Sequence, residues 1–227
     1  MRKIIELGKG IGIFFLYLFL PLVVVNIFSS LFRGLNQTIL LISTQTIVLL
    51  VLMVIFRKVL ISDFKTINKA GLKQTFKYWG FGFLAMVVFN IIILTFINPG
   101  GLAANEELNR ELLGSNIIFA LFAMVIFAPI AEELVFRAGF KKVFNNAFTF
   151  ATFSGLFFGL IHVAAAFLIP EGGSNLVELV YIFPYMSLGF AFAYAYFKTN
   201  NIYNVIIVHA AHNAFAVSVI LLSMLLS

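Results

Sequence analysis

The sequence predicts an all-α fold, a polytopic transmembrane helix bundle of about seven spans with its N-terminus inside. Three observations predict this class. Of the 227 residues, 62% are hydrophobic and 11% are charged, whereas soluble domains are roughly 45–50% apolar. The mean hydropathy is +1.07. Apolar runs recur along the chain, each near the ~20 residues that cross a bilayer core. We therefore expect a single integral-membrane domain over residues 1–227 and no soluble domain.

The first expected span covers about residues 11–28 and follows a basic N-terminal segment. It is too long for a signal-peptide core, and no small-residue cleavage site follows it. Two further expected spans cover about residues 38–56 and 78–97, and a fourth starts at about residue 116. The last three cover about residues 149–168, 176–197 and 202–226. This order leaves two longer connecting segments, one before and one after the third span.

Basic residues predict the orientation. With the N-terminus inside, only Arg33 and Arg110 of the 15 basic residues lie in outer segments, and cytoplasmic segments of membrane proteins are rich in Lys and Arg. The inner segment 57–77 mixes apolar and basic residues, which predicts an amphipathic stretch in the membrane interface. A calmodulin-like or nucleic-acid target is the alternative there. The outer segment 98–101 has turn chemistry, and we expect its acidic continuation to form a short surface helix.

Cysteine and net charge exclude several functions. The chain has no cysteine, which excludes disulfides, thiol nucleophiles and thiolate metal ligands. The net charge of +6 does not indicate nucleic acid, because the basic residues gather on one side of the expected membrane. We expect contact with the lipid bilayer and no nucleic-acid partner.

Two adjacent carboxylates, Glu132 and Glu133, end a wholly apolar run from Ile117 to Ile130. A charge in the hydrocarbon costs about 2.5–3.5 kcal/mol on insertion scales, so an ionisable residue there indicates a functional site by default. On a helix, Glu133 and Arg137 are four residues apart and can pair in the favourable order. Glu132 points about 100° away and needs a partner from elsewhere in the chain. Solvation of both glutamates at a membrane edge is the alternative.

All three histidines, His162, His209 and His212, fall inside expected spans. With a rise of 1.5 Å per residue, Glu132, His162 and His209 lie at similar depths of about 15–18 Å from the inner ends of their spans. A histidine in a membrane helix can also serve only as a hydrogen-bonding group between helices. Three such residues beside a buried glutamate pair favour a site.

Two further pairs of polar and aromatic residues share helix faces because they are four apart: Phe158 with His162, and His209 with Asn213. A carboxylate and an imidazole in a low-dielectric pocket can act as a general base on water. A second imidazole and an amide N–H can stabilise an oxyanion. This combination suits hydrolysis of an amide.

Small residues also recur at four-residue spacing beside these histidines, at Gly155 and Gly159 and at Ala210 and Ala214. Such small-x-x-x-small patterns let a neighbouring helix approach closely. For the glycines we favour an ordinary packing role.

Three patterns of carboxylate, imidazole and amide residues occur in order: Glu132-Glu133-x-x-x-Arg137, Phe158-x-x-x-His162 and His209-x-x-x-Asn213. Together they resemble the motifs of the CPBP family of intramembrane proteases. This family includes type II CAAX prenyl endopeptidases and bacteriocin-processing and immunity relatives. The resemblance covers about residues 115–220, a protease-like core, while the first three spans match only as generic membrane helices.

The resemblance implies an intramembrane endopeptidase and a role for each motif residue. Glu132 and His162 would activate the water, and His209 and Asn213 would form the oxyanion site. Glu133 and Arg137 would hold the helix end and orient Glu132, with Phe158 as a structural neighbour of His162.

The resemblance leaves the cofactor open. A metal-free glutamate mechanism and a metalloprotease mechanism both fit, since carboxylate and imidazole ligands suit zinc. If a metal is used, its ligands would be Glu132, His162 and His209. His212 lies outside the motifs and is either a fourth ligand or, as we favour, a packing residue.

The expected substrate is a peptide or membrane-protein segment cut near the inner leaflet, and the expected location is a bacterial plasma membrane. The main alternative is a non-catalytic bacteriocin self-immunity or scaffold membrane protein of the same fold. A proton-coupled transporter is a third reading, because Glu and His chains also relay protons. No inverted repeat or broken helix is visible in the sequence to support it.

Overall fold

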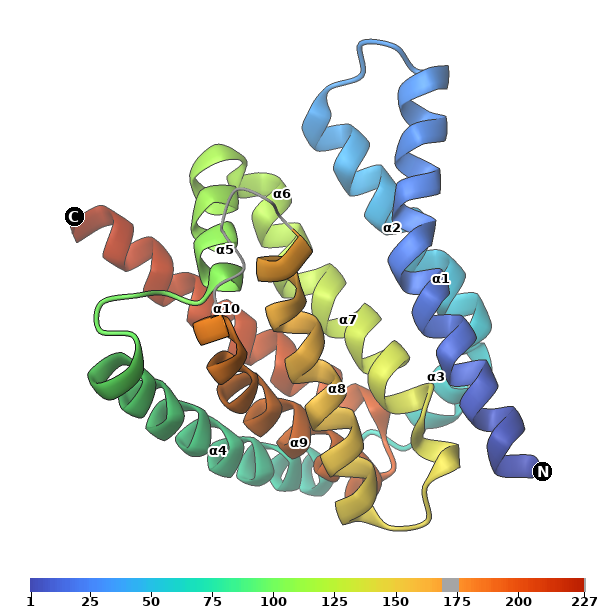
Figure 1. The fold of residues 1–227 in the computed structure, drawn as a ribbon. Coiled ribbons are helices and arrows are strands. Elements are labelled where there is room, and N and C mark those ends of the chain that lie inside the picture. Colours follow the sequence, from blue (N-terminus) through green and yellow to red (C-terminus); the bar gives the residue numbers. More distant parts are fainter. Residues whose placement is uncertain (169–175, 227) are drawn as a thin grey trace. The chain divides into compact units, whose positions relative to one another are not determined.

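The structure, a computed structural model, describes residues 1–168 and 176–226. The described residues are largely helical and contain no strand (Figure 1). Within the described residues, seven helices are long and apolar enough to cross a membrane: Arg2–Leu31, Gln37–Ile55, Lys69–Ile97, Ile117–Val143, Ala147–Ala164, Leu176–Thr199 and Ile202–Leu226. The predicted fold class and number of spans are confirmed. The orientation with the N-terminus inside stays a prediction.

Two spans begin several residues earlier than expected. The first covers Arg2–Leu31 rather than about residues 11–28, so the basic N-terminal segment is part of the helix. Helix α4 (Lys69–Ile92) begins nine residues earlier than the expected third span, at residue 69 rather than 78. The expected amphipathic stretch 57–77 is therefore divided between the short helix α3 (Arg57–Phe64) and the first turns of α4. The expected short helix in the acidic outer segment is present as α5 (Ala104–Ser115).

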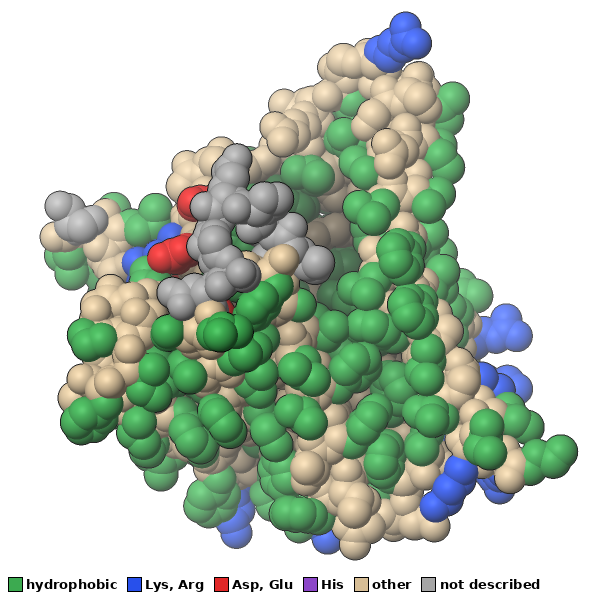
Figure 2. All heavy atoms as spheres, viewed as in Figure 1, with side chains coloured by type: hydrophobic (Ala, Val, Ile, Leu, Met, Phe, Trp, Pro, Cys, Tyr) green, Lys and Arg blue, Asp and Glu red, His purple; other side chains and the backbone are tan. Residues whose placement is uncertain are grey.

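The exposed faces of the helices are apolar. Figure 2 shows hydrophobic side chains over most of the visible face, with Lys and Arg at its margins. Large side chains such as Phe19, Phe81 and Leu84 are more than half exposed. Contiguous apolar surface on this scale indicates contact with membrane rather than water, so the chain is an integral membrane protein.

The chain divides into two compact units, unit 1 (Met1–Ile67, Leu112–Val143 and Asn201–Ser227) and unit 2 (Asn68–Glu111 and Phe144–Asn200). In unit 1 the fourth span lies at the centre and contacts α1 (Arg2–Leu31), α2 (Gln37–Ile55) and α10 (Ile202–Leu226). The expectation of a single domain stays a prediction.

Within unit 1, α3 holds the start of α10. The buried carboxylate of Asp63 accepts a hydrogen bond from the Ile202 backbone N–H at 2.9 Å, and Asn201 Nδ2 donates to the Asp63 carbonyl at 2.6 Å. The first N–H groups of a helix have no partner inside the helix, and a carboxylate there is favourable toward the helix dipole. Asp63 therefore fixes the beginning of the helix that carries His209 two turns later.

The fourth span is not one regular α-helix. It consists of α6 (Ile117–Leu121), a π-helical segment η2 (Phe122–Phe127), α7 (Ala128–Glu132), a second π-helical segment η3 (Glu133–Ala138) and a 3₁₀ turn η4 (Lys141–Val143). We call these segments together the composite span. Segments of π-helix are rare and often occur at functional sites. The sequence predicted the span but not these two interruptions.

A proline in the composite span leaves one backbone carbonyl of η2 without its hydrogen-bond donor. In η2 the Ala128 N–H donates to the Ala123 carbonyl, five residues earlier. In this register the Met124 carbonyl would accept from residue 129, which is Pro129 and has no N–H. Neither residue 128 nor residue 129 therefore supplies a hydrogen bond to Met124.

In unit 2, α9 (Ile182–Thr199) packs against both α8 (Ala147–Leu168) and α4, and the 3₁₀ turn η6 (Leu176–Tyr181) precedes it. The α8–α9 approach is very close at the two glycines. A Cβ atom on Gly155 would lie 2.8 Å from the Phe190 nitrogen, and one on Gly159 would lie 2.8 Å from the Ile182 carbonyl oxygen. The predicted close helix approach at these glycines is confirmed.

Candidate active site

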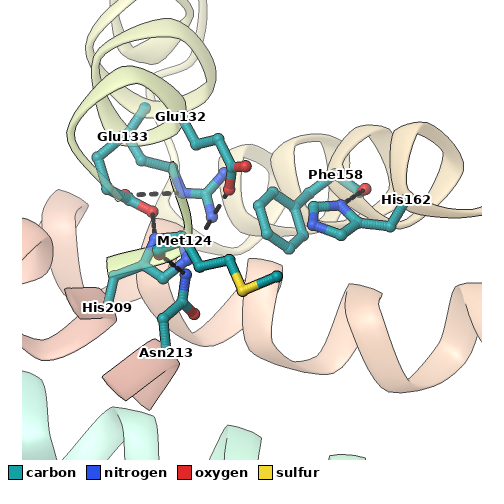
Figure 3. Close-up of polar contacts among 8 residues, drawn as sticks. Met124, Glu132, Glu133, Phe158, His162, His209 and Asn213 are labelled. Carbon is teal, nitrogen blue, oxygen red and sulfur yellow. Dashed lines mark hydrogen bonds and ion pairs between the residues drawn. The ribbon is translucent and has the colours of Figure 1, made fainter. Parts of the chain in front are cut away.

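Glu133 links Arg137 and His209 in a buried network of unit 1. Its Oε2 lies 3.1 Å from Arg137 Nε, and its Oε1 lies 2.9 Å from His209 Nδ1 (Figure 3). The side chains of Glu133 and Arg137 have no exposed surface. Removing one partner of such a pair leaves an uncompensated charge, so this network holds η3 to α10. The Glu133–Arg137 pair matches the helical spacing in the sequence.

His209 also lies close to Glu132. Its Nε2 lies 3.8 Å from Glu132 Oε2, which is an ion-pair distance but too long for a direct hydrogen bond. Because the Glu133 carboxylate can only accept, Nδ1 of His209 carries a proton and Nε2 is the atom that faces Glu132. The partner that Glu132 was expected to need from elsewhere in the chain is therefore His209.

The two glutamates differ in exposure. The Glu132 side chain is 13% exposed, whereas that of Glu133 is completely buried. Glu133 is engaged by two partners, and Glu132 is the carboxylate that a water or substrate can reach. Of the two adjacent carboxylates, Glu132 is thus the more accessible one.

Asn213 compensates for the missing hydrogen bond in the composite span. Its Nδ2 donates to the Met124 carbonyl at 2.8 Å, the carbonyl that Pro129 leaves without its π-helical donor. An amide group has two N–H bonds, and Met124 accepts one of them. Asn213 thus ties α10 to η2 one turn beyond His209.

His162 lies in unit 2, on α8, within an aromatic environment. Its Nδ1 lies 2.8 Å from the Phe158 carbonyl oxygen (Figure 3), so Nδ1 donates and Nε2 carries the lone pair. Its ring lies 4.1 Å from the Phe158 ring and stacks on the Tyr185 ring at 4.7 Å. The Tyr185 hydroxyl accepts a hydrogen bond from Asn105 Nδ2 at 3.3 Å. These contacts orient an imidazole whose Nε2 can act as a base.

The structure thus sorts the candidate residues by unit. Unit 1 brings together Glu132, Glu133, Arg137, His209 and Asn213, and unit 2 brings together Phe158 and His162. Their catalytic roles stay predictions. His212 lies half-buried on α10, three residues from His209.

Sequence reasoning missed three contributors: Met124, Tyr185 and Asp63. In a π-helix, a proline leaves the carbonyl five residues before it without a hydrogen-bond donor. Because the sequence does not show that this segment is π-helical, it could not indicate a role for Met124. A tyrosine inside an apolar span needs a partner for its hydroxyl group, and this signal could have found Tyr185. Asp63 is an acidic residue within a basic segment, which could have indicated a capping role.

The donor set of unit 1 does not complete a zinc site. Glu132 and His209 provide two ligands, and the other ring nitrogen of His209 is bound to Glu133. Catalytic zinc sites use three protein ligands and an open position. Across the described ranges 1–168 and 176–226, no group of three His, Cys, Asp or Glu side chains is arranged to hold a metal ion.

The fold and this centre define a class: a polytopic membrane protein with a buried carboxylate–imidazole site. Residues 114–215 match the family described as type II CAAX prenyl endopeptidase Rce1-like. All seven candidate residues lie within that range. The resemblance to CPBP intramembrane proteases is thereby confirmed for this segment of the chain.

One curated relative is Uncharacterized protein YyaK of Bacillus subtilis (strain 168), which is 28% identical over 168 residues. The alignment covers 70% of this chain and 53% of the relative, so the chain spans about half the length of that protein. No solved structure matches the chain.

Proposed function

We propose that this protein is an intramembrane endopeptidase that hydrolyses a peptide bond of a membrane-associated peptide or protein. One observation carries the proposal: Glu132 remains accessible beside His209, whose ring is oriented by the fully buried Glu133–Arg137 pair. The match of residues 114–215 to Rce1-like endopeptidases supports it. A purely structural ion pair would need no accessible second carboxylate.

In this mechanism Glu132 is the general base. Its carboxylate accepts a proton from a water molecule as the water oxygen attacks the carbonyl carbon of the scissile bond. The tetrahedral intermediate then collapses, the C–N bond breaks, and Glu132 returns the proton to the leaving amine nitrogen. The products are a carboxylic acid and an amine, and the enzyme recovers its initial state.

In this proposal His209 and Asn213 are the donors that stabilise the oxyanion. A second proton, on Nε2, would make His209 a donor toward the developing charge, with Nδ1 still held by Glu133 at 2.9 Å. The second N–H of the Asn213 amide would be the other donor, since its first is bound to Met124. Each preorganised donor of this kind contributes about 10²–10³ in rate. His162 would assist the water through Nε2.

The test uses the full chain in nanodiscs and a panel of quenched fluorescent peptides, including one with a farnesylated Cys at a C-terminal Cys-a-a-X sequence. We expect wild-type protein to cleave at least one peptide. Glu132→Gln should lower the rate by about 10²–10⁴, the contribution of a general base. The matched control is Glu111→Gln, at an exposed glutamate of α5. Full activity of Glu132→Gln would contradict the proposal.

Two further arms separate the remaining mechanisms. Cleavage that is lost with a chelator and restored by zinc would indicate a metalloprotease, whereas insensitivity to the chelator would support the glutamate mechanism. Bacteriocin resistance that is equally strong in cells carrying wild type, Glu132→Gln or His162→Ala would favour the non-catalytic immunity protein instead.

A further inference from the structure

Unit 2 contains an apolar groove between α4 and α9 that the proposed chemistry does not use. Its volume is about 490 Å³, within the roughly 300–1,000 Å³ of pockets that bind small molecules. Its walls are mainly aromatic: Phe81, Phe89, Phe183, Phe190 and Tyr194. The hydroxyl of Ser187, which also lines it, donates to the Phe183 carbonyl of its own helix at 2.8 Å. The lining therefore suits a hydrocarbon chain.

The floor of the groove is formed by small residues. A Cβ atom on Gly82 would lie 2.9 Å from the Ser187 carbonyl oxygen and would overlap the Ala191 Cβ. The two helix backbones therefore approach closely there, while the aromatic side chains on either side form walls. Ala85 continues this floor one turn further along α4.

The length of the groove matches one leaflet. At one end Tyr78 packs edge-to-face on Tyr194 at 5.1 Å, and at the other end Phe89 stacks on Phe183 at 5.5 Å. Tyr78 and Phe89 are 11 residues apart on one helix, which is about 16 Å at the α-helical rise. This is about half of the ~30 Å hydrocarbon core.

Two lysines, Lys77 and Lys198, lie at the end of the groove that is formed by Tyr78 and Tyr194. Lys198 holds its Nζ 5.4 Å from the centre of the Tyr194 ring. Lys77 directly precedes Tyr78 and lies one turn before Phe81 on the same helix face. Both lysines are exposed, and neither α4 nor α9 contains an Asp or Glu. A ligand in the groove thus meets uncompensated cations at one end and hydrocarbon along the rest.

We propose that the α4–α9 groove is a binding site for an anionic phospholipid. One acyl chain lies along the aromatic walls, and the headgroup phosphate is held by Lys77 and Lys198. Basic pockets between membrane helices bind anionic headgroups, and a lysine near such a surface contributes about fivefold in affinity. Two lysines predict a preference of about 25-fold for an anionic over a zwitterionic lipid.

The only tryptophan of the chain, Trp79, provides the readout. It follows Tyr78 at the basic end of the groove and stacks on Phe83 at 5.3 Å. The full chain is reconstituted in phosphatidylcholine vesicles with graded amounts of either brominated phosphatidylglycerol or brominated phosphatidylcholine. We expect the brominated anionic lipid to quench Trp79 at the lower mole fraction, by about the 25-fold preference that two lysines predict.

Matched variants assign that preference to the groove. Lys77→Gln combined with Lys198→Gln should make the two lipids equally effective quenchers. The control pair Lys58→Gln with Lys65→Gln removes two exposed lysines of unit 1 and should keep the preference.

A filling substitution tests the acyl-chain part. Ala85→Phe places a ring on the floor of the groove and should weaken quenching by both lipids, with the melting temperature as a check on folding. Equal quenching of wild type by both lipids would overturn the proposal, and so would a preference that survives in the Lys77/Lys198 variant. A groove occupied by an apolar protein segment would give the first of these results.

Discussion

Glu133 is the residue at which the buried charges of unit 1 meet. Glu133→Gln keeps an oxygen that can accept from His209 Nδ1 but leaves the Arg137 cation without its counter-charge. Breaking a buried pair in this way costs about 3–5 kcal/mol. We expect Glu133→Gln to lower the free energy of unfolding by about that amount, measured by denaturant titration in mixed micelles. Glu133→Gln/Arg137→Met should recover most of the loss.

The chain offers a control with the same spacing. Glu106 and Arg110 are also four residues apart, at 2.8 Å, but their side chains are 39% and 32% exposed. Exposed pairs contribute about 0–1 kcal/mol, so Glu106→Gln should change the free energy of unfolding by no more than that. Equal losses of unfolding free energy in Glu106→Gln and Glu133→Gln would show that burial does not determine the strength of the Glu133–Arg137 pair.

For single residues, the sequence predicted ion-pair partners on the same helix but not partners on other helices. The Glu133–Arg137 pair follows from four-residue spacing on one helix. The Glu133–His209 bond joins residues 76 positions apart, and no periodicity encodes which ring nitrogen faces which carboxylate. Depth arithmetic did place His209 and Glu132 at a similar level, and the structure brings them to 3.8 Å.

The composite span is the element whose local structure determines the site. Asn213 donates to the Met124 carbonyl, so Asn213→Ala should leave a buried acceptor without a donor and cost about 1–3 kcal/mol. Pro129→Ala restores a backbone N–H at the position that faces Met124 in the π-helical register. We therefore expect Asn213→Ala to be less destabilising in the Pro129→Ala background, as a double-mutant cycle of unfolding free energies would measure.

A neighbouring residue supplies the control for this cycle. Ser218 lies on the same helix and bonds only within it, to the Ala214 carbonyl at 2.7 Å. Ser218→Ala should therefore add to Pro129→Ala without coupling. Simple additivity of Asn213→Ala and Pro129→Ala would contradict the link between the proline and the amide.

The sequence predicted elements well where apolar length decides them, because a span needs about 20 apolar residues whatever its neighbours are. The bounds of α2 and α10 differ from the expected spans by one residue or less at each end. The π-helical segments η2 and η3 were not predicted. Segment η2 lies in a continuous apolar run, and η3 lies at the polar end of that run. A change from α-helical to π-helical hydrogen bonds does not alter the hydropathy of the sequence, so hydropathy could not predict either segment.

At the scale of the whole molecule, the described residues contain seven candidate spans. Because this number is odd, we expect the residues before the first span and after the last to lie on opposite sides of the membrane. The distribution of basic residues predicts that the N-terminal side is inside. Helix α2 tests this directly because it is short: its 19 residues extend about 28 Å, close to the ~30 Å core. The residues just before and after α2 must then face different compartments.

The absence of cysteine from the chain makes single-cysteine labelling possible without removing native thiols. Leu35→Cys and Ser62→Cys introduce thiols at accessible positions on either side of α2 and change no charge. We expect a membrane-impermeant maleimide to label Leu35→Cys in intact cells and Ser62→Cys only after lysis, with wild type unlabelled throughout. The reverse pattern would place the N-terminus outside. Labelling of both in intact cells would show that α2 does not cross the bilayer.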